Sequence, residues 1–314
     1  MAIKANLRAR QRRRRILWVS ILAVLVGLLV LVYFVAAMGT SQYDKYIGQP
    51  VSGTLQQQIT GVSDSTLAAV GAPTGVSPPV KISGTPLTSG GKPEVLYIGG
   101  EFCPYCAIER WSLIVALSRF GTFQGLEYML SSSTDLNANT PTFTFANATY
   151  TSSYVTFVPV EKFGRQGQQQ VIQPLTSEQQ SLVSQFDVCS TNNQAGGIPF
   201  VDIANQYAVN CGAQFVLPDQ QQYLTSSSQP NIIGMNWTQI ASQLDNPNSG
   251  VAQMIDGAAN TLITAICKVT NNTPSAVCTQ SYANQTLSFV SMPPAGSQAL
   301  LAVPARAADQ HWTD

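Results

Sequence analysis

Two cysteines, Cys103 and Cys106, are the side chains of this sequence best placed to do chemistry. They lie in the stretch GGEFCPYCAIERW, with Pro104 and Tyr105 between them. A cysteine thiolate is both a nucleophile and a metal ligand. A pair at this spacing is therefore a redox couple, half of a zinc site or a small structural disulfide. The rest of the chain must decide among these three interpretations.

A zinc site requires a second pair of ligands at a matching spacing. The chain has one histidine, His311, and no second CxxC, since its other four cysteines are spread over positions 189 to 278. A structural disulfide within the CxxC also gains little, because closing so short a loop constrains the unfolded chain weakly. The sequence therefore favours a redox couple, and we expect no metal and no other cofactor.

The elements around the pair suit this chemistry. Residues 94–99, EVLYIG, are apolar and β-prone and predict a buried strand. Residues 106–120 carry apolar side chains close to a 3.6-residue period and predict a helix. A cysteine where strand gives way to helix is stabilised as a thiolate by the unpaired N–H groups of the first turn. We therefore expect Cys103 to be the exposed attacking sulfur and Cys106 the resolving thiol, with Pro104 tolerated in the first turn.

A second element lies further along the chain, where Ile198 and Pro199 precede an apolar stretch. A proline at the start of a strand is common by itself. A strand, a CxxC at a helix start and a later Ile-Pro opening a hairpin strand together resemble the thioredoxin fold. The resemblance implies that Pro199 is cis and packs beside the redox pair. It also implies that Ile198 offers backbone groups to a substrate strand.

Longer phrases resemble a narrower family. YIGGEFCPYCAIERWSLIVALSRFG, GGIPFVDIANQY and GAANTLITAIC are similar to domain-of-unknown-function family 929 (DUF929), thioredoxin-like proteins of archaea and actinobacteria that are often membrane-anchored. The similarity covers about residues 60–280. It implies a fold and a location, and no particular activity.

The acidic residues near the pair depart from the thioredoxin pattern. Thioredoxins carry a buried acid six residues before the first cysteine, where this chain has Tyr97. Glu101 and Glu109 are the acids nearest in sequence, and either could shuttle a proton to Cys106. Glu109 could equally be a solvated helix residue.

The four remaining cysteines suit an oxidising compartment, where an even count is expected. Cys267 and Cys278 enclose a short segment after a predicted helix, and we expect a structural disulfide between them. Cys189 and Cys211 flank the Ile-Pro segment. They form either a structural disulfide or a second redox pair that accepts electrons from the CxxC.

The N-terminal region predicts a membrane anchor. Ile16 to Ala37 carries no charge and, as a helix, spans about 33 Å, which is enough to cross a membrane core of ~30 Å. It follows the arginine-rich stretch RARQRRRR, so the positive-inside rule leaves the N-terminus in the cytoplasm and the rest of the chain outside. A cleaved signal peptide is the alternative, although its apolar run would usually be shorter.

The remaining pattern predicts one α/β domain: a thioredoxin-like fold with an inserted β-hairpin and a C-terminal helical extension, preceded by the transmembrane helix. We expect a basic cytoplasmic segment 1–15, the membrane helix 16–37, a stalk 38–92 with a short helix at 64–70, the domain 93–290 and a flexible tail 291–314. Within the domain we expect a second strand at 126–133, the hairpin at 142–161, helices at 176–186, 237–269 in two pieces and 275–290, and a hairpin turning at Asn205–Gln206.

The composition excludes one class of partner. Charged residues make up 10% of the chain against a typical ~25%, and the net charge is zero, so we expect no nucleic-acid partner. The sequence thus predicts a membrane-tethered, extracytoplasmic thiol–disulfide oxidoreductase that acts on thiols and disulfides of exported proteins. It would need a membrane or soluble partner to recycle its cysteines. The alternative is a non-catalytic binding or assembly module with the CxxC locked as a disulfide.

Overall fold

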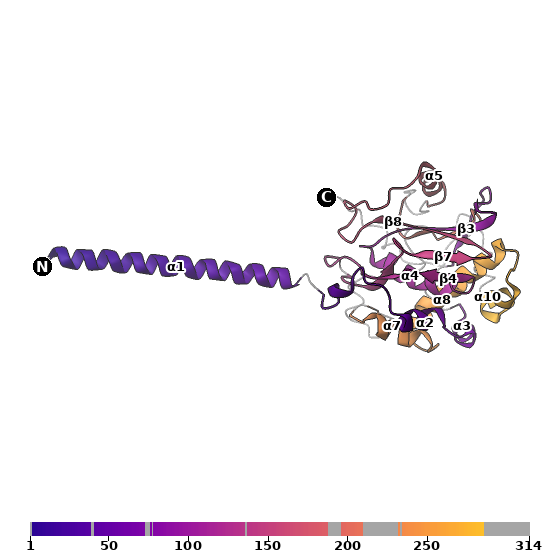
Figure 1. Ribbon diagram of the computed structural model, residues 1–314, viewed down its shortest axis with the longest axis horizontal. Helices are drawn as coiled ribbons and strands as arrows, with labels where there is room; N and C mark the ends of the chain where they lie inside the picture. The colour runs from indigo at the N-terminus through magenta and orange to yellow at the C-terminus, as the bar shows by residue number, and fades with distance from the viewer. Residues whose placement is uncertain are drawn as a thin grey trace, which may run out of the picture. The chain divides into compact units, whose positions relative to one another are not determined.

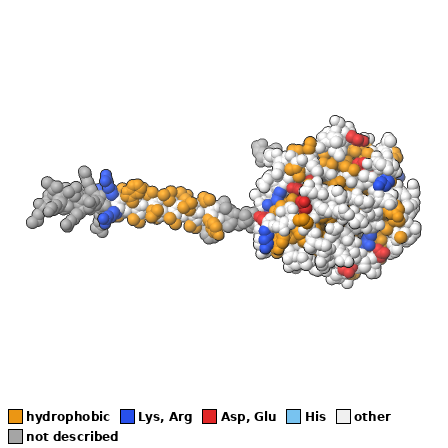
Figure 2. Space-filling view, viewed as in Figure 1, with side chains coloured by type: hydrophobic (Ala, Val, Ile, Leu, Met, Phe, Trp, Pro, Cys, Tyr) orange, Lys and Arg blue, Asp and Glu red, His pale blue; other side chains and the backbone are white. Residues whose placement is uncertain are grey.

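The computed structural model describes residues 2–38, 41–72, 76, 78–135, 137–187, 196–209, 232 and 234–285. The chain divides into two compact units, Met1–Asp44 and Lys45–Asp314. The first is the helix α1, Ala2–Met38. Within it Arg13–Tyr33 is long and apolar enough to cross a membrane, and Figure 2 shows apolar side chains following the arginines along this helix.

A mixed sheet forms the centre of the second unit. Its strands are β1 (Val80–Lys81), β2 (Thr88–Ser89), β3 (Lys92–Gly100), β8 (Thr156–Phe163), β9 (Phe200–Ile203) and β10 (Tyr207–Val209). β3 pairs with β8 in parallel and with β9 in antiparallel fashion, and β10 and then β1 continue the sheet beyond β9. The centre of the sheet is apolar on both faces because the residues of β3 from Val95 to Ile98 are all buried.

Helices cover both faces of this sheet (Figure 1). Helix α5 (Ser177–Phe186) begins at the capping box of Thr176 and Gln179 that the sequence predicts. It packs apolar side chains, including Phe186, against Leu96 of β3. Helix α4 (Pro104–Leu117) lies on the opposite face and packs against α8 (Gly250–Val269). The end of β3 and the start of α4 therefore meet at one edge of the molecule's central layer.

The segment between α4 and β8 differs from the expected single hairpin. It contains β4 (Gly121–Gln124), β5 (Glu127–Leu130), β6 (Pro141–Thr144) and β7 (Thr149–Ser152). β5 pairs with β6 and β4 with β7, while the end of the expected hairpin is β8 of the central sheet. The expectations failed because alternation identifies a strand without identifying its partner. Aromatic rings such as Phe123, Phe145 and Phe157 pack between these strands.

The C-terminal part is helical, as the sequence predicts. α7 (Trp237–Leu244) and α8 are separated at the NPNSG turn, and α9 (Ser275–Cys278) and α10 (Ser281–Gln285) follow. A disulfide joins Cys267 at the end of α8 to Cys278 in α9 and confirms the predicted pair. The expected tail from 291 lies outside the described residues.

The expected stalk is corrected by the structure. Beyond a 3-10 turn at Asp44–Tyr46, helices α2 (Gly53–Thr60) and α3 (Asp64–Val70) belong to the globular unit, and α3 has the predicted bounds. Their side chains Leu55, Ile59 and Leu67 are buried. Each apolar side chain comes from a short helix in a glutamine- and serine-rich context, so no long apolar period signals that the segment folds onto the domain.

Candidate functional site

The two cysteines lie where β3 ends and α4 begins. Cys103 is the N-cap of α4 and Pro104 occupies the first turn, where the missing N–H costs no hydrogen bond. The backbone N–H of Cys106 donates to the sulfur of Cys103 over 3.4 Å. Both cysteines are free thiols. The sulfur that caps the helix thus receives an N–H group that would otherwise lack a partner.

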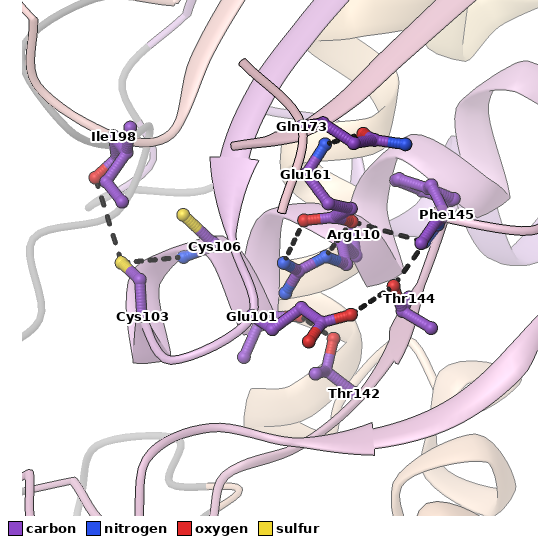
Figure 3. A network of polar contacts seen from close by, with 12 residues as sticks. Glu101, Cys103, Cys106, Arg110, Thr142, Thr144, Phe145, Glu161, Gln173 and Ile198 are labelled. Atoms are coloured by element: carbon purple, nitrogen blue, oxygen red, sulfur yellow. Dashed lines mark hydrogen bonds and ion pairs between the residues drawn. The ribbon is translucent and has the colours of Figure 1, made fainter. Parts of the chain in front are cut away.

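The Ile-Pro segment faces the pair from across the sheet edge. The thiol of Cys103 donates to the backbone carbonyl of Ile198 over 3.8 Å, and the Ile198–Pro199 peptide bond is cis, which is the geometry that the resemblance implies. A Cβ at Gly100 would lie 3.1 Å from the end of the Ile198 side chain, a tight contact that would require a small shift of that side chain. Figure 3 shows Cys103 between Ile198 and the backbone of Cys106.

Cys103 is less accessible than the sequence suggests. It retains 5% of its accessible surface, and Cys106 is fully buried, so neither sulfur is exposed as the attacking thiol was expected to be. The cause is the close packing of the helix start against the Ile198 carbonyl and the end of β3. Partly exposed residues flank Cys103, namely Phe102, Tyr105 and Ile198. A reaction partner must therefore reach the sulfur between these side chains.

The surroundings shift the pKa values of the two thiols in opposite directions. Burial opposes ionisation of Cys103, yet the hydrogen bonds from the side chain and backbone of Cys106 and the charge of Arg110 leave the pKa of Cys103 below its ordinary value. Burial raises the pKa of Cys106 well above its ordinary value, and the neighbouring Cys103 adds to that rise. This difference favours Cys103 as the thiolate of the pair.

The supporting residues named from the sequence occupy distinct environments. Glu101 is buried and accepts a hydrogen bond of 2.7 Å from the hydroxyl of Thr144. Burial raises the pKa of Glu101. Glu109 is not the solvated helix residue that one interpretation expected: it is fully buried, and its carboxyl oxygens have no hydrogen-bond partner among the residues described. Burial raises the pKa of Glu109 to about 8. Tyr105 is partly exposed beside Cys103, and burial raises its pKa as well.

Sequence reasoning missed a buried ion pair beneath the cysteines. Arg110, one helical turn beyond Cys106, donates from Nε and Nη2 to the two carboxylate oxygens of Glu161 in β8 over 2.8 and 2.6 Å. Both side chains are fully buried. The available signal was an arginine on an otherwise apolar helix stripe, but nothing in the sequence links it to a glutamate 51 residues away.

Cys189 and Cys211 lie outside the described residues, so their pairing stays a prediction. Within the described part of the chain no three His, Cys, Asp or Glu side chains are arranged to hold a metal ion.

The site is therefore a buried dithiol at a helix start, facing a cis proline, in a mixed α/β domain. The model of the family named Domain of unknown function (DUF929) matches residues 78–268, and the chain belongs to that family. Comparisons with curated proteins and with solved structures gave no match.

Proposed function

We propose that this protein is a membrane-tethered, extracytoplasmic thiol–disulfide oxidoreductase with a thioredoxin-like fold. The observation that carries the proposal is the arrangement of the dithiol: Cys103 caps the start of α4 with its pKa below the ordinary value, and Cys106 is buried with its pKa raised. The Ile198 carbonyl 3.8 Å from the sulfur of Cys103 adds to it.

The connectivity supports the thioredoxin-like assignment. A strand (β3), a helix (α4), a parallel strand (β8), a helix on the other face (α5), an antiparallel hairpin (β9 and β10) and a further helix (α8) follow one another, with sheet order β10-β9-β3-β8. This is the order of the thioredoxin fold with the β4–β7 segment inserted between α4 and β8. Fold alone does not define an activity, so the proposal rests on the site.

The chemistry is a pair of thiol–disulfide exchanges. The Cys103 thiolate attacks a substrate disulfide, forms a mixed disulfide and releases one substrate thiolate. Cys106 then attacks the sulfur of Cys103, which forms the Cys103–Cys106 disulfide and releases the second substrate thiolate. The substrate gains two electrons and the pair loses two, and every step runs equally in reverse. The net direction depends on whether the recycling partner is a dithiol reductant or a disulfide or quinone oxidant.

An exposed apolar surface beside the dithiol suits polypeptide substrates. Val171 and Ile172 are 54% and 38% exposed. They are fixed next to Phe163, which forms a bridge with Val171 and pairs with Gly100 just before the CxxC. The ring of Phe163 lies 6.1 Å from that of Phe102. We name these four residues, Phe102, Phe163, Val171 and Ile172, the apolar ledge. Unfolded chains with unpaired cysteines expose apolar segments that such a surface can bind.

The proposed location rests on α1 and on the disulfide. The helix has the length and composition of a membrane span, and arginines precede it, which favours a globular unit outside the cytoplasm under the positive-inside rule. The Cys267–Cys278 disulfide suits an oxidising compartment.

The second candidate is a binding module that does not exchange disulfides. The 5% exposure of Cys103 favours it. That candidate requires the CxxC to stay a fixed disulfide, so its cysteines would not react with an alkylating reagent before reduction.

Turnover with thiol titration tests the proposal. The full-length chain in detergent is expected to exchange disulfides with a scrambled model protein, and the Cys103→Ser variant to lose this activity. Alkylation of the reduced chain is expected to modify Cys103 at a lower pH than an ordinary cysteine, since its pKa lies below the ordinary value. Thiols of ordinary reactivity together with no exchange would contradict the proposal.

A further inference from the structure

One guanidinium nitrogen of Arg110 makes no hydrogen bond within the described structure. Two of its three guanidinium nitrogens bind Glu161, and Nη1 is buried with no hydrogen-bond partner among the described residues. A buried guanidinium N–H without a partner costs free energy and needs a reason. Arg110 follows Cys106 by four residues on α4, so the two side chains lie on the same helix face. Figure 3 shows both projecting from that helix.

Glu161 is held on several sides. One of its oxygens accepts both from Arg110 and, over 3.1 Å, from the backbone N–H of Phe145. Its own backbone N–H donates to the side chain of Gln173 over 2.6 Å. A carboxylate bound in this way fixes the position of the guanidinium, because the bidentate pairing allows one planar arrangement. The guanidinium of Arg110 is therefore held in a fixed position on the helix that carries Cys106, with the charge of Glu161 opposing part of its effect.

The groups that face this charge belong to several elements. Tyr97 of β3 lies with its ring 5.8 Å from the guanidinium carbon, and its hydroxyl has no partner within the described structure. Glu101 interacts with the charges of both Arg110 and Glu161. The charge of Arg110 helps to lower the pKa of Cys103. It also offsets part of the rise that burial causes in the pKa of Cys106, so it acts on both sulfurs.

We propose that Arg110 is a positioning residue that stabilises negative charge on the Cys103–Cys106 dithiol, and that Glu161 holds it in place and limits the size of its effect. This inference deepens the proposed function and rests on it. The reduced pair carries a thiolate and the disulfide carries no charge. A nearby cation therefore stabilises the reduced form and makes the disulfide a stronger oxidant. The two residues together set how oxidising the pair is.

Variants of the two residues give effects of opposite sign. Glu161→Gln removes the negative charge and keeps an acceptor for Arg110, so the pKa of Cys103 is expected to fall by about one unit. The equilibrium with glutathione is expected to shift about tenfold toward the reduced pair. The double variant Arg110→Met with Glu161→Gln removes both charges without leaving a buried charge unpaired. It is expected to move both quantities in the other direction by a similar amount.

Two further variants separate charge from packing. Arg110→Lys keeps the charge and is expected to stay near the wild-type pKa, although its geometry is poorer. Asp64→Asn removes the charge that pairs with Arg119, just beyond the other end of α4, and is expected to leave the pKa of Cys103 unchanged. The measurement is the ultraviolet absorbance of the thiolate against pH in the full-length chain, with the glutathione equilibrium read by alkylation.

The outcomes separate this inference from the proposed function. If the Glu161→Gln variant and the double variant leave the pKa of Cys103 unchanged, or move it in the same direction, Arg110 has no electrostatic role and the inference is overturned. This result leaves protein disulfide exchange untouched. If the shifts have opposite signs while the wild-type chain fails to exchange protein disulfides, the charge coupling stands and the proposed function falls.

Discussion

Glu109 is a titratable residue in an environment that disfavours its charged form. Its carboxyl group is fully buried in α4, and no hydrogen-bond partner lies among the described residues. Burial raises the pKa of Glu109 from 4.5 to about 8, so the folded chain keeps this carboxyl protonated at neutral pH. Glu109 follows Cys106 by three residues on α4, and its role as a proton shuttle to Cys106 stays a prediction.

The cost of this burial appears as a pH dependence of stability. The folded state holds the proton more tightly than the unfolded state, so the protonated form stabilises the fold fully below about pH 4.5, and this contribution is lost as pH rises to about 8. Glu109→Gln cannot titrate. The difference in free energy of unfolding between this variant and the wild type is expected to shift by about 3 kcal/mol in favour of the variant as pH rises from 4 to 7.

Urea unfolding of the detergent-solubilised chain at the two pH values measures this gain. Ser112→Ala is the control, since Ser112 is also buried without a hydrogen-bond partner in the described structure but does not titrate. Its effect must be the same at both pH values. A Glu109→Gln variant whose advantage does not change with pH would show that Glu109 is ionised and paired.

At the residue level the sequence located the two cysteines and the Cys267–Cys278 disulfide from spacing along the chain, whereas the cis proline was expected only from the resemblance to the thioredoxin fold. It did not locate the Arg110–Glu161 pair, because that contact depends on β8 lying parallel to β3. The burial of Cys103 was also missed, since its accessibility depends on how the Ile198 carbonyl packs against it.

Among the elements, the segment after β8 carries the most exposed side chains of the apolar ledge. Val171 forms a bridge with Phe163, and the N–H of Ile172 donates to the backbone carbonyl of Lys162 over 3.0 Å. The segment is therefore attached to the strand that ends beside the CxxC. Its exposed apolar side chains have no evident structural use, which supports a role in binding.

Substitutions on the apolar ledge test this role. Val171→Ser together with Ile172→Ser removes apolar surface that a bound chain would cover, at a cost of about 1–2 kcal/mol. We expect kcat/KM for a scrambled protein substrate to fall roughly tenfold through KM. Exchange with a small disulfide reagent and the alkylation rate of Cys103 serve as controls and are expected to stay unchanged. An equal loss toward the protein and the small reagent would show that the ledge supports the dithiol instead of binding substrate.

The sequence predicted most helices and strands but not all their partners. The helices at Asp64–Val70, Trp237–Leu244 and Gly250–Val269 follow from caps and apolar periods that are local. Strand pairing is not local, so residues 142–161 were expected to form one hairpin, whereas β6 and β7 pair with β5 and β4 and β8 joins the central sheet. Likewise, α2 and α3 pack into the globular unit through contacts with α7 and α8, which lie much further along the chain.

The whole molecule combines a membrane-type helix with a domain that carries little charge. Within the described residues, the exposed large apolar side chains lie mainly on α1, as a membrane span requires. The visible face of the globular unit is mostly uncharged (Figure 2). An anchored dithiol protein would meet exported chains close to the membrane, where they emerge unfolded. Its recycling partner would have to reach the same dithiol.

Trapping of the mixed disulfide tests the central claim most directly. Full-length chain carrying Cys106→Ser, produced in its native membrane, cannot resolve an adduct formed at Cys103. We expect exported proteins to be joined to Cys103 through disulfides that a reductant releases, with peptide mapping showing the linkage at that sulfur. The matched variant Cys103→Ser is expected to carry no such adducts. An absence of adducts in the Cys106→Ser variant, or equal amounts in both variants, would contradict the account.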